Sequence, residues 1–154
     1  MNTDMRSNPG DDAKLHGMVQ FFESLTAESV QHLDRVYATG ASFKDPFNDV
    51  CGLPAIAHIF SHMFTQVDDA RFVVTTQIVR GDTAFLTWDF LFRMKRFSTA
   101  QQCIRGATHL RFATDGRVNF HRDYWDAAEE LYEKLPILGG FMRLLKRAVA
   151  RDAE

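Results

Sequence analysis

The chain has 154 residues, is 45% hydrophobic and 12% aromatic, and carries a formal net charge of −2. This composition excludes an intrinsically disordered chain, and without a basic excess a nucleic-acid-binding protein is not expected. No run of about 18 apolar residues is present, so we expect no transmembrane helix. The first residues lack the apolar core of a signal peptide, and we expect a cytoplasmic protein. The two cysteines, Cys51 and Cys103, are isolated, which predicts free thiols and no zinc site.

The first predicted elements are helices. Residues 1–13 are polar and predict a flexible N-terminal arm, followed by a single domain over residues 14–151. From Lys14 to Leu25, apolar residues recur at the spacing of a helix. Thr26 has the character of an N-cap for a second helix.

A short extended segment over residues 41–45 ends at Pro46, and a third helix begins at Leu53 with a proline in its first turn. His58 and His62 on this helix have the spacing of metal ligands. They lie opposite its apolar stripe with no carboxylate between them, so we interpret them as a solvated face and expect no metal.

Extended segments with alternating apolar residues follow in two pairs, 72–80 with 83–97 and 105–114 with 117–125. Gly81-Asp82 joins the first pair as a two-residue turn. Asp115-Gly116 joins the second as a type I′ turn. Asp126 then begins a short helix, and a basic amphipathic helix is predicted over residues 141–150. Helices before and after a run of antiparallel strands indicate an α+β fold.

The second turn sets which residues oppose one another across the hairpin: Thr108 with Asp123, Leu110 with His121, and Gly106 with Trp125. Because side chains alternate across a sheet, His121, Asp123 and Trp125 share one face with Thr108. Gly106 would leave room for a ligand beside them. Phe120, Arg122 and Tyr124 share the opposite face, whose mixture of aromatic and basic residues suits a partner surface.

Each residue of the first face also has a structural interpretation. His121 can bond a neighbour, and Asp123 can pair with an arginine or hold a turn. Thr108 can form a cross-strand hydrogen bond with Asp123, and Trp125 can belong to the core.

Asp45, in the triplet Asp45-Pro46-Phe47, is a further candidate. A residue before proline is extended, so its carboxylate can point inward between Phe43 and Phe47 and act as a base. In the alternative, the carboxylate bonds the amides of a turn.

Four stretches carry a family resemblance, and they read YATGASFKDPF, CGLPAIAHIF, LRFATDGRV and DYWDAAEE. In this order they resemble the ketosteroid isomerase and SnoaL-like polyketide cyclase branch of the nuclear transport factor 2-like superfamily, over roughly residues 15–135. The resemblance implies a cystatin-like cone, in which a curved, mostly antiparallel sheet wraps around N-terminal helices. It implies a pocket for a small apolar molecule and a homodimer through the outer sheet face.

The same resemblance places Asp45 on the general base of the isomerase, and His121, Asp123 and Trp125 on pocket-lining positions. Phe21 and Thr108 stand where the isomerase has the tyrosine hydroxyl and the protonated carboxylic acid that stabilise its enolate. Phenylalanine donates no hydrogen bond, so that machinery is incomplete.

We therefore expect one of two functions. The first is an acid–base enzyme without a cofactor, an isomerase, lyase or hydrolase that acts on an apolar metabolite through Asp45, His121 and Asp123. The pocket would also hold Phe47, together with Asp89 if its strand pairs in the required register. The second is a non-catalytic ligand-binding or dimerisation module. The helix over residues 141–150 is expected to dock within the protein or its dimer, in preference to a membrane.

Overall fold

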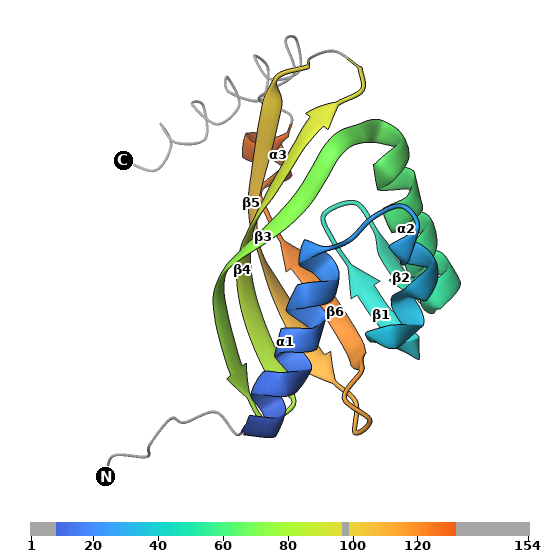
Figure 1. The fold of residues 1–154 in the computed structure, drawn as a ribbon, viewed down its shortest axis with the longest axis vertical. Helices are drawn as coiled ribbons and strands as arrows, with labels where there is room; N and C mark the ends of the chain where they lie inside the picture. Colours follow the sequence, from blue (N-terminus) through green and yellow to red (C-terminus); the bar gives the residue numbers. More distant parts are fainter. Residues whose placement is uncertain (1–8, 97–98, 132–154) are drawn as a thin grey trace, which may run out of the picture.

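The computed structural model describes residues 9–96 and 99–131 (Figure 1). Its helical elements are α1 (Pro9–Glu23), the 3-10 helix η1 (Ser29–Arg35), α2 (Leu53–Gln66) and α3 (Ala127–Glu130). The strands are β1 (Tyr37–Lys44), β2 (Asp49–Cys51), β3 (Val67–Arg80), β4 (Thr83–Met94), β5 (Gln101–Phe112) and β6 (Val118–Tyr124). The predicted helix over residues 141–150 lies outside the described residues.

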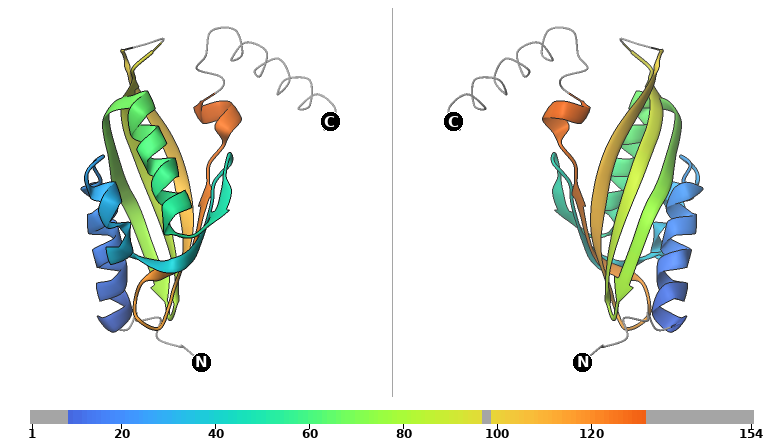
Figure 2. Two further views of the ribbon diagram at one scale, coloured as in Figure 1. Left: turned by 90° about the vertical axis from the view of Figure 1, so that its right-hand side faces the viewer. Right: turned by 90° about the vertical axis from the view of Figure 1, so that its left-hand side faces the viewer.

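The six strands form one sheet in the order β2-β1-β6-β5-β4-β3. β1 runs parallel to β6, and the other neighbouring strands are antiparallel. The sheet is curved, and α1 and α2 lie on its concave side (Figure 2). This is the α+β architecture that the sequence predicts, with a mostly antiparallel sheet around N-terminal helices.

Helix α1 begins at Pro9, so residues 9–13, which we expected in the N-terminal arm, are helical. The polar composition of this stretch concealed a helix start. Proline is favoured in the first turn, and the carboxylates of Asp11 and Asp12 interact favourably with the helix dipole there. The remainder of the predicted arm, residues 1–8, lies outside the described part of the chain.

The two hairpin turns differ from one another. Arg80 pairs with Thr83, so the first loop has two residues, as predicted. In the second, Ala113 donates its N–H to the carbonyl of Arg117, and Gly116 has a φ of +86°. This is a three-residue loop with a left-handed glycine, and the predicted type I′ turn is wrong because Asp115 does not have the positive φ that such a turn requires.

The register beyond this loop is nevertheless the predicted one, because a second irregularity compensates for the extra loop residue. The pairing shifts by one residue between Arg111 and Phe112, after which Leu110 opposes His121 and Thr108 opposes Asp123. The concave face of β5 and β6 therefore carries the residues expected of it.

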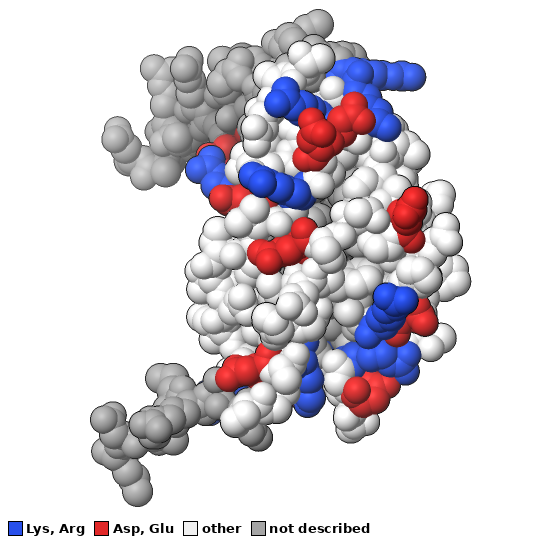
Figure 3. Space-filling view, viewed as in Figure 1, with Lys and Arg blue, Asp and Glu red and all other residues white. Residues whose placement is uncertain are grey.

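The core lies between the concave face and the helices. On β4 the inward residues alternate with outward ones, and the inward set is Ala84, Leu86, Trp88, Phe90 and Phe92. Buried residues of α1 and α2, among them Met18, Val19, Ile56 and Phe60, pack against this layer. Figure 3 shows one face of the molecule, on which the acidic and basic side chains of the described residues are interspersed. None of the described helices is long and apolar enough to cross a membrane.

Candidate functional site

Two cavities meet on the concave side of the sheet. The larger has a volume of about 590 Å³ and is bounded by α2, by the inward residues of β4 and by the segment around Trp125. The smaller, of about 40 Å³, lies under α1. Phe60, Phe72, Trp88 and Asp123 line both cavities. The carboxylate of Asp123 is therefore placed at the boundary between them.

Asp123 accepts two hydrogen bonds on one oxygen. The hydroxyl of Thr108 lies 2.5 Å from Asp123 Oδ1, and His121 Nε2 lies 2.7 Å from the same atom. The side chain of Asp123 is 17% exposed, and that of His121 is 5% exposed. Asp123 Oδ2 makes no hydrogen bond to any described residue.

The hydrogen bonds on either side of Asp123 fix the direction of each donor. Trp88 Nε1 donates to Thr108 Oγ1 over 2.7 Å, which leaves the Thr108 proton for Asp123. Tyr37 Oη lies 2.6 Å from His121 Nδ1. A carboxylate oxygen only accepts, so His121 Nε2 carries a proton, and Nδ1 of the neutral ring accepts from Tyr37. Two series of donors, Trp88 through Thr108 and Tyr37 through His121, are thus directed at the Asp123 carboxylate.

Burial raises the pKa of Tyr37 well above its usual value, and the negative charge of Asp123 raises it further. The phenol therefore keeps its proton and remains a donor. The alternative, in which His121 is doubly protonated and donates to Tyr37, would leave the Tyr37 proton without an acceptor among the described residues. Since Tyr37 is 0% exposed, that arrangement would cost about 1–3 kcal/mol.

Gly106 has a different role from the one its position suggested. A Cβ atom at Gly106 would lie 2.5 Å from two ring carbons of Trp88. The space that we predicted for a ligand is therefore occupied by the indole, which lies against Gly106 and reaches Thr108. The packing of Trp88 on this glycine positions the first donor of the network.

The carboxylate of Asp45 bonds the amides of a turn, which is the alternative to a catalytic base that its sequence position left open. Its Oδ1 accepts from the N–H groups of Phe47 and Asn48, each over 2.7 Å, and from Asn48 Nδ2 over 3.0 Å. Its Oδ2 accepts from Asn48 Nδ2 over 3.1 Å. The residue still lines the large cavity. The same carboxylate thus shapes the loop and borders the ligand space.

Phe47 and Trp125 both line the large cavity, as expected of pocket residues. Their rings meet edge to face, with centroids 5.4 Å apart. Phe47 is 51% exposed. Together with Asp45, these two rings form what we call the aromatic corner at the cavity mouth.

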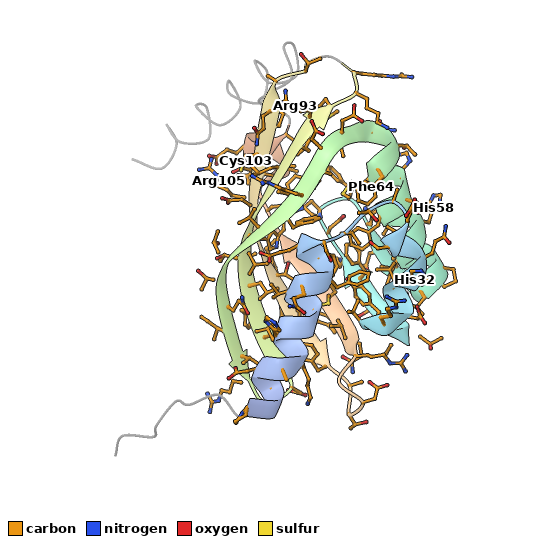
Figure 4. The ribbon with its side chains drawn as sticks, viewed as in Figure 1. His32, His58, Phe64, Arg93, Cys103 and Arg105 are labelled. Atoms are coloured by element: carbon orange, nitrogen blue, oxygen red, sulfur yellow. The ribbon has the colours of Figure 1, made fainter. Side chains whose placement is uncertain are left out.

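Two expected pocket residues lie elsewhere. Asp89 is on the convex face, because Trp88 takes the inward position and side chains alternate. It opposes Arg105 in the register of β4 and β5, and Figure 4 shows Arg105 on the side of β5 away from α1 and α2. Phe21 lines a separate surface hollow beside α1, and its neighbour Phe22 takes the inward position.

Three residues of the site were missed, namely Tyr37, Trp88 and Phe22. The alternating apolar pattern of β4 contained the signal for Trp88. The contact between Tyr37 and His121 has no local signal, because it depends on the parallel pairing of β1 with β6.

His58 and His62 are exposed on α2, where Figure 4 labels His58, and both are among the residues that line the large cavity. Among the described residues, no group of three or more His, Cys, Asp and Glu side chains is arranged to hold a metal ion.

We compared the sequence with those of known protein families. The sequence model of the SnoaL-like domain family matches residues 18–121 of this chain. No curated protein matches the chain.

Several solved structures share the fold. A candidate SnoaL-like polyketide cyclase from Jannaschia sp. CCS1 has a TM-score of 0.71 at 14% identity, over 82% of this chain and 94% of that one. TsrD from Streptomyces laurentii has a TM-score of 0.66 at 14% identity, over 85% and 98%. A protein with a ketosteroid isomerase-like fold from Catenulispora acidiphila, in complex with trimethylamine, has a TM-score of 0.66 at 13% identity, over 81% and 92%. These likenesses establish a common nuclear transport factor 2-like fold.

Proposed function

Because the chain belongs to the SnoaL-like domain family, we propose that it is an acid–base enzyme that removes a proton from an apolar small molecule. In this proposal Asp123 is the base. His121 and Thr108 act through Asp123 and are positioning residues. The observation that carries the proposal is the set of donors directed at one carboxylate oxygen of a residue that lines both cavities, while its second oxygen has no hydrogen-bond partner among the described residues.

The geometry favours Asp123 over Asp45 as the base. Both oxygens of Asp45 accept hydrogen bonds within its own turn. Asp123 Oδ2 has no such partner among the described residues. The donors on Oδ1 hold the carboxylate in place, so little reorganisation is needed when a substrate arrives.

A neutral probe can test the base without knowledge of the substrate. 5-Nitrobenzisoxazole loses its C3 proton to a carboxylate while its N–O bond breaks, which gives a coloured phenolate; the carboxylic acid then returns the proton to water. We expect the wild type to accelerate this reaction well beyond free acetate. Asp123→Asn should lower the rate about 100-fold, the range of a general base.

Asp89→Asn provides the matched control, because it removes a carboxylate from the convex face. It should leave the rate unchanged. A wild-type rate in Asp123→Asn would overturn the assignment, and loss of activity in Asp45→Asn alone would transfer the role of base to Asp45.

A non-catalytic ligand-binding module is the second candidate, and the lining of the large cavity favours it. Most of the residues that line this cavity are apolar or aromatic. Ligand binding without any acceleration of the probe reaction would support this candidate. One structural neighbour forms a complex with trimethylamine, and we include amines among the proposed ligand classes.

We also propose a homodimer through the convex face. Four of its apolar side chains are exposed, namely Val73, Ile78, Phe85 and Tyr124. Ile78 on β3 lies directly opposite Phe85 on β4, and this exposed apolar pair supports an interaction surface there. Sedimentation equilibrium should give a dimer for the wild type and a monomer for Phe85→Glu; a monomeric wild type would overturn the proposal.

A further inference from the structure

The charges that line the large cavity are of one sign. Among the described lining residues are two carboxylates, Asp45 and Asp123, and neither a lysine nor an arginine. His58 and His62 border the cavity from α2. With neutral imidazoles, the lining therefore carries negative charge in a largely apolar space.

Nearby cations do not compensate this charge inside the cavity. Lys44 and Arg122 share a surface hollow with Asp45 and Asp123, but neither lines the large cavity. Lys44 Nζ is bonded to Asp49 over 2.8 Å. The guanidinium of Arg122 lies over the ring of Tyr124, 4.8 Å from its centroid.

Aromatic rings supply the second feature of the lining. Eight of the lining residues are phenylalanine or tryptophan. The faces of such rings attract cations, and quaternary ammonium groups are commonly held by cages of aromatic side chains. At the aromatic corner, Phe47 and Trp125 stand beside Asp45, whose position is fixed by its own turn.

We infer that the large cavity takes an apolar amine, whose ammonium group lies at the aromatic corner and whose apolar body extends toward Asp123. This inference names the substrate class of the proposed function and rests on it. A neutral ligand would remove water from the two carboxylates without replacing it, which is costly. An anion would be repelled by them. An ammonium group supplies the missing positive charge.

Two ligands of the same shape but different charge distinguish the effect of charge on binding from the effect of size. Benzyltrimethylammonium and neopentylbenzene differ in the replacement of a cationic nitrogen by carbon. The chain has two tryptophans, Trp88 and Trp125, and both line the large cavity, so tryptophan fluorescence reports on it. We expect the cation to bind at least about tenfold more tightly than its neutral isostere. Equal affinities, tighter binding of neopentylbenzene, or no binding of the cation would overturn the inference.

Variants at the aromatic corner locate the ammonium group. In Asp45→Asn the amide oxygen can still accept the three hydrogen bonds made to Oδ1, and only the bond from Asn48 Nδ2 to Oδ2 is lost, so the change mainly removes the charge. Phe47→Leu removes the ring but keeps an apolar side chain. Each variant should weaken the binding of the cation more than that of neopentylbenzene, so that the preference for the cation falls at least about threefold. Asp89→Asn and Phe85→Leu make the same changes on the convex face and should have no effect.

The outcomes for the two proposals are distinct. A wild type that converts 5-nitrobenzisoxazole but shows no preference for the cation would overturn the amine inference alone. A wild type that prefers the cation but does not convert the probe would overturn the base assignment and leave an amine-binding protein. A preference that persists in both corner variants would contradict the placement of the ammonium group.

Discussion

Two histidines on neighbouring strands show how the two faces of the sheet differ. His121 points to the concave side, is 4% exposed, and bonds Tyr37 and Asp123 through its two ring nitrogens. His109 points to the convex side, where it stacks on Phe85 with ring centroids 4.5 Å apart. The same residue type is thus part of a satisfied polar network on one face and of an aromatic surface on the other.

The pKa of a group is raised on one face and that of a group on the other face is lowered. On the concave side, burial and the charge of Asp123 raise the pKa of Tyr37. On the convex side, partial burial, followed by the charges of Arg111 and Arg122, lowers the pKa of His109. The concave face therefore preserves protons that its network needs as donors, and the convex face disfavours an additional positive charge.

The largest predicted effect is on the concave network. His121→Ala removes the hydrogen-bond partner of Tyr37 and one of the two donors to Asp123, and it opens a cavity, so we expect a loss of about 3–4 kcal/mol in the free energy of unfolding. His109→Ala on the convex face should cost about 1 kcal/mol or less. Urea denaturation of the two variants measures this difference. Equal losses would show that the network contributes no more than surface stacking.

Gly106→Ala should destabilise the protein by about 2–3 kcal/mol, because its Cβ would overlap the indole of Trp88. Gly40→Ala is the matched control, since nothing lies within 4 Å of a Cβ there. It should be close to neutral. Denaturation of both variants provides the measurement, and a neutral Gly106→Ala would show that Trp88 does not pack as described.

Alkaline pH should destabilise the protein through Tyr37. Its pKa in the folded state is above the unfolded value of about 10, so from that pH upward the unfolded chain loses a proton that the folded chain keeps. Stability should therefore be unaffected by this group below about pH 10 and fall by about 1.4 kcal/mol per pH unit above it. Tyr37→Phe should remove this component, whereas Tyr124→Phe should retain it. An unchanged slope in Tyr37→Phe would contradict the prediction.

Mild acid should have the smallest effect. The pKa of His109 in the folded state is below its unfolded value, so the unfolded chain binds the proton first as the pH falls through about 6.5. Stability should therefore decrease between neutral pH and the lowered pKa. Thermal unfolding of the wild type at neutral and at mildly acidic pH, compared with His109→Gln, tests this; the variant should lose less stability on acidification.

Local patterns predicted much of the fold because each pattern involves residues that are close together in the sequence. The alternation of β4, the start of α2 at Leu53 and the N-cap Asp126 follow from short stretches, and Asp126 Oδ1 accepts from two amides at the start of α3. The pairing of Thr108 with Asp123 was predicted correctly although the turn was not. A three-residue loop and a bulge shift the register in opposite directions, and no local pattern showed either.

The site was less predictable because it combines distant elements. Tyr37 reaches His121 only through the parallel pairing of β1 and β6, and the space beside Gly106 is filled by Trp88 from another strand. Asp45 was equally consistent with a turn and with a base from its sequence, and the three-dimensional structure is what shows its turn hydrogen bonds.

The protonation of His121 tests the central claim most directly, because the hydrogen bond from Tyr37 to His121 and the one from His121 to Asp123 both depend on it. Nitrogen-15 NMR of the imidazole at neutral pH distinguishes the two neutral tautomers from the charged ring. We expect a proton on Nε2 and none on Nδ1, with a hydrogen bond from Tyr37 to Nδ1 that is lost in Tyr37→Phe. A proton on Nδ1 would contradict the account, because the donors would then no longer all be directed at Asp123.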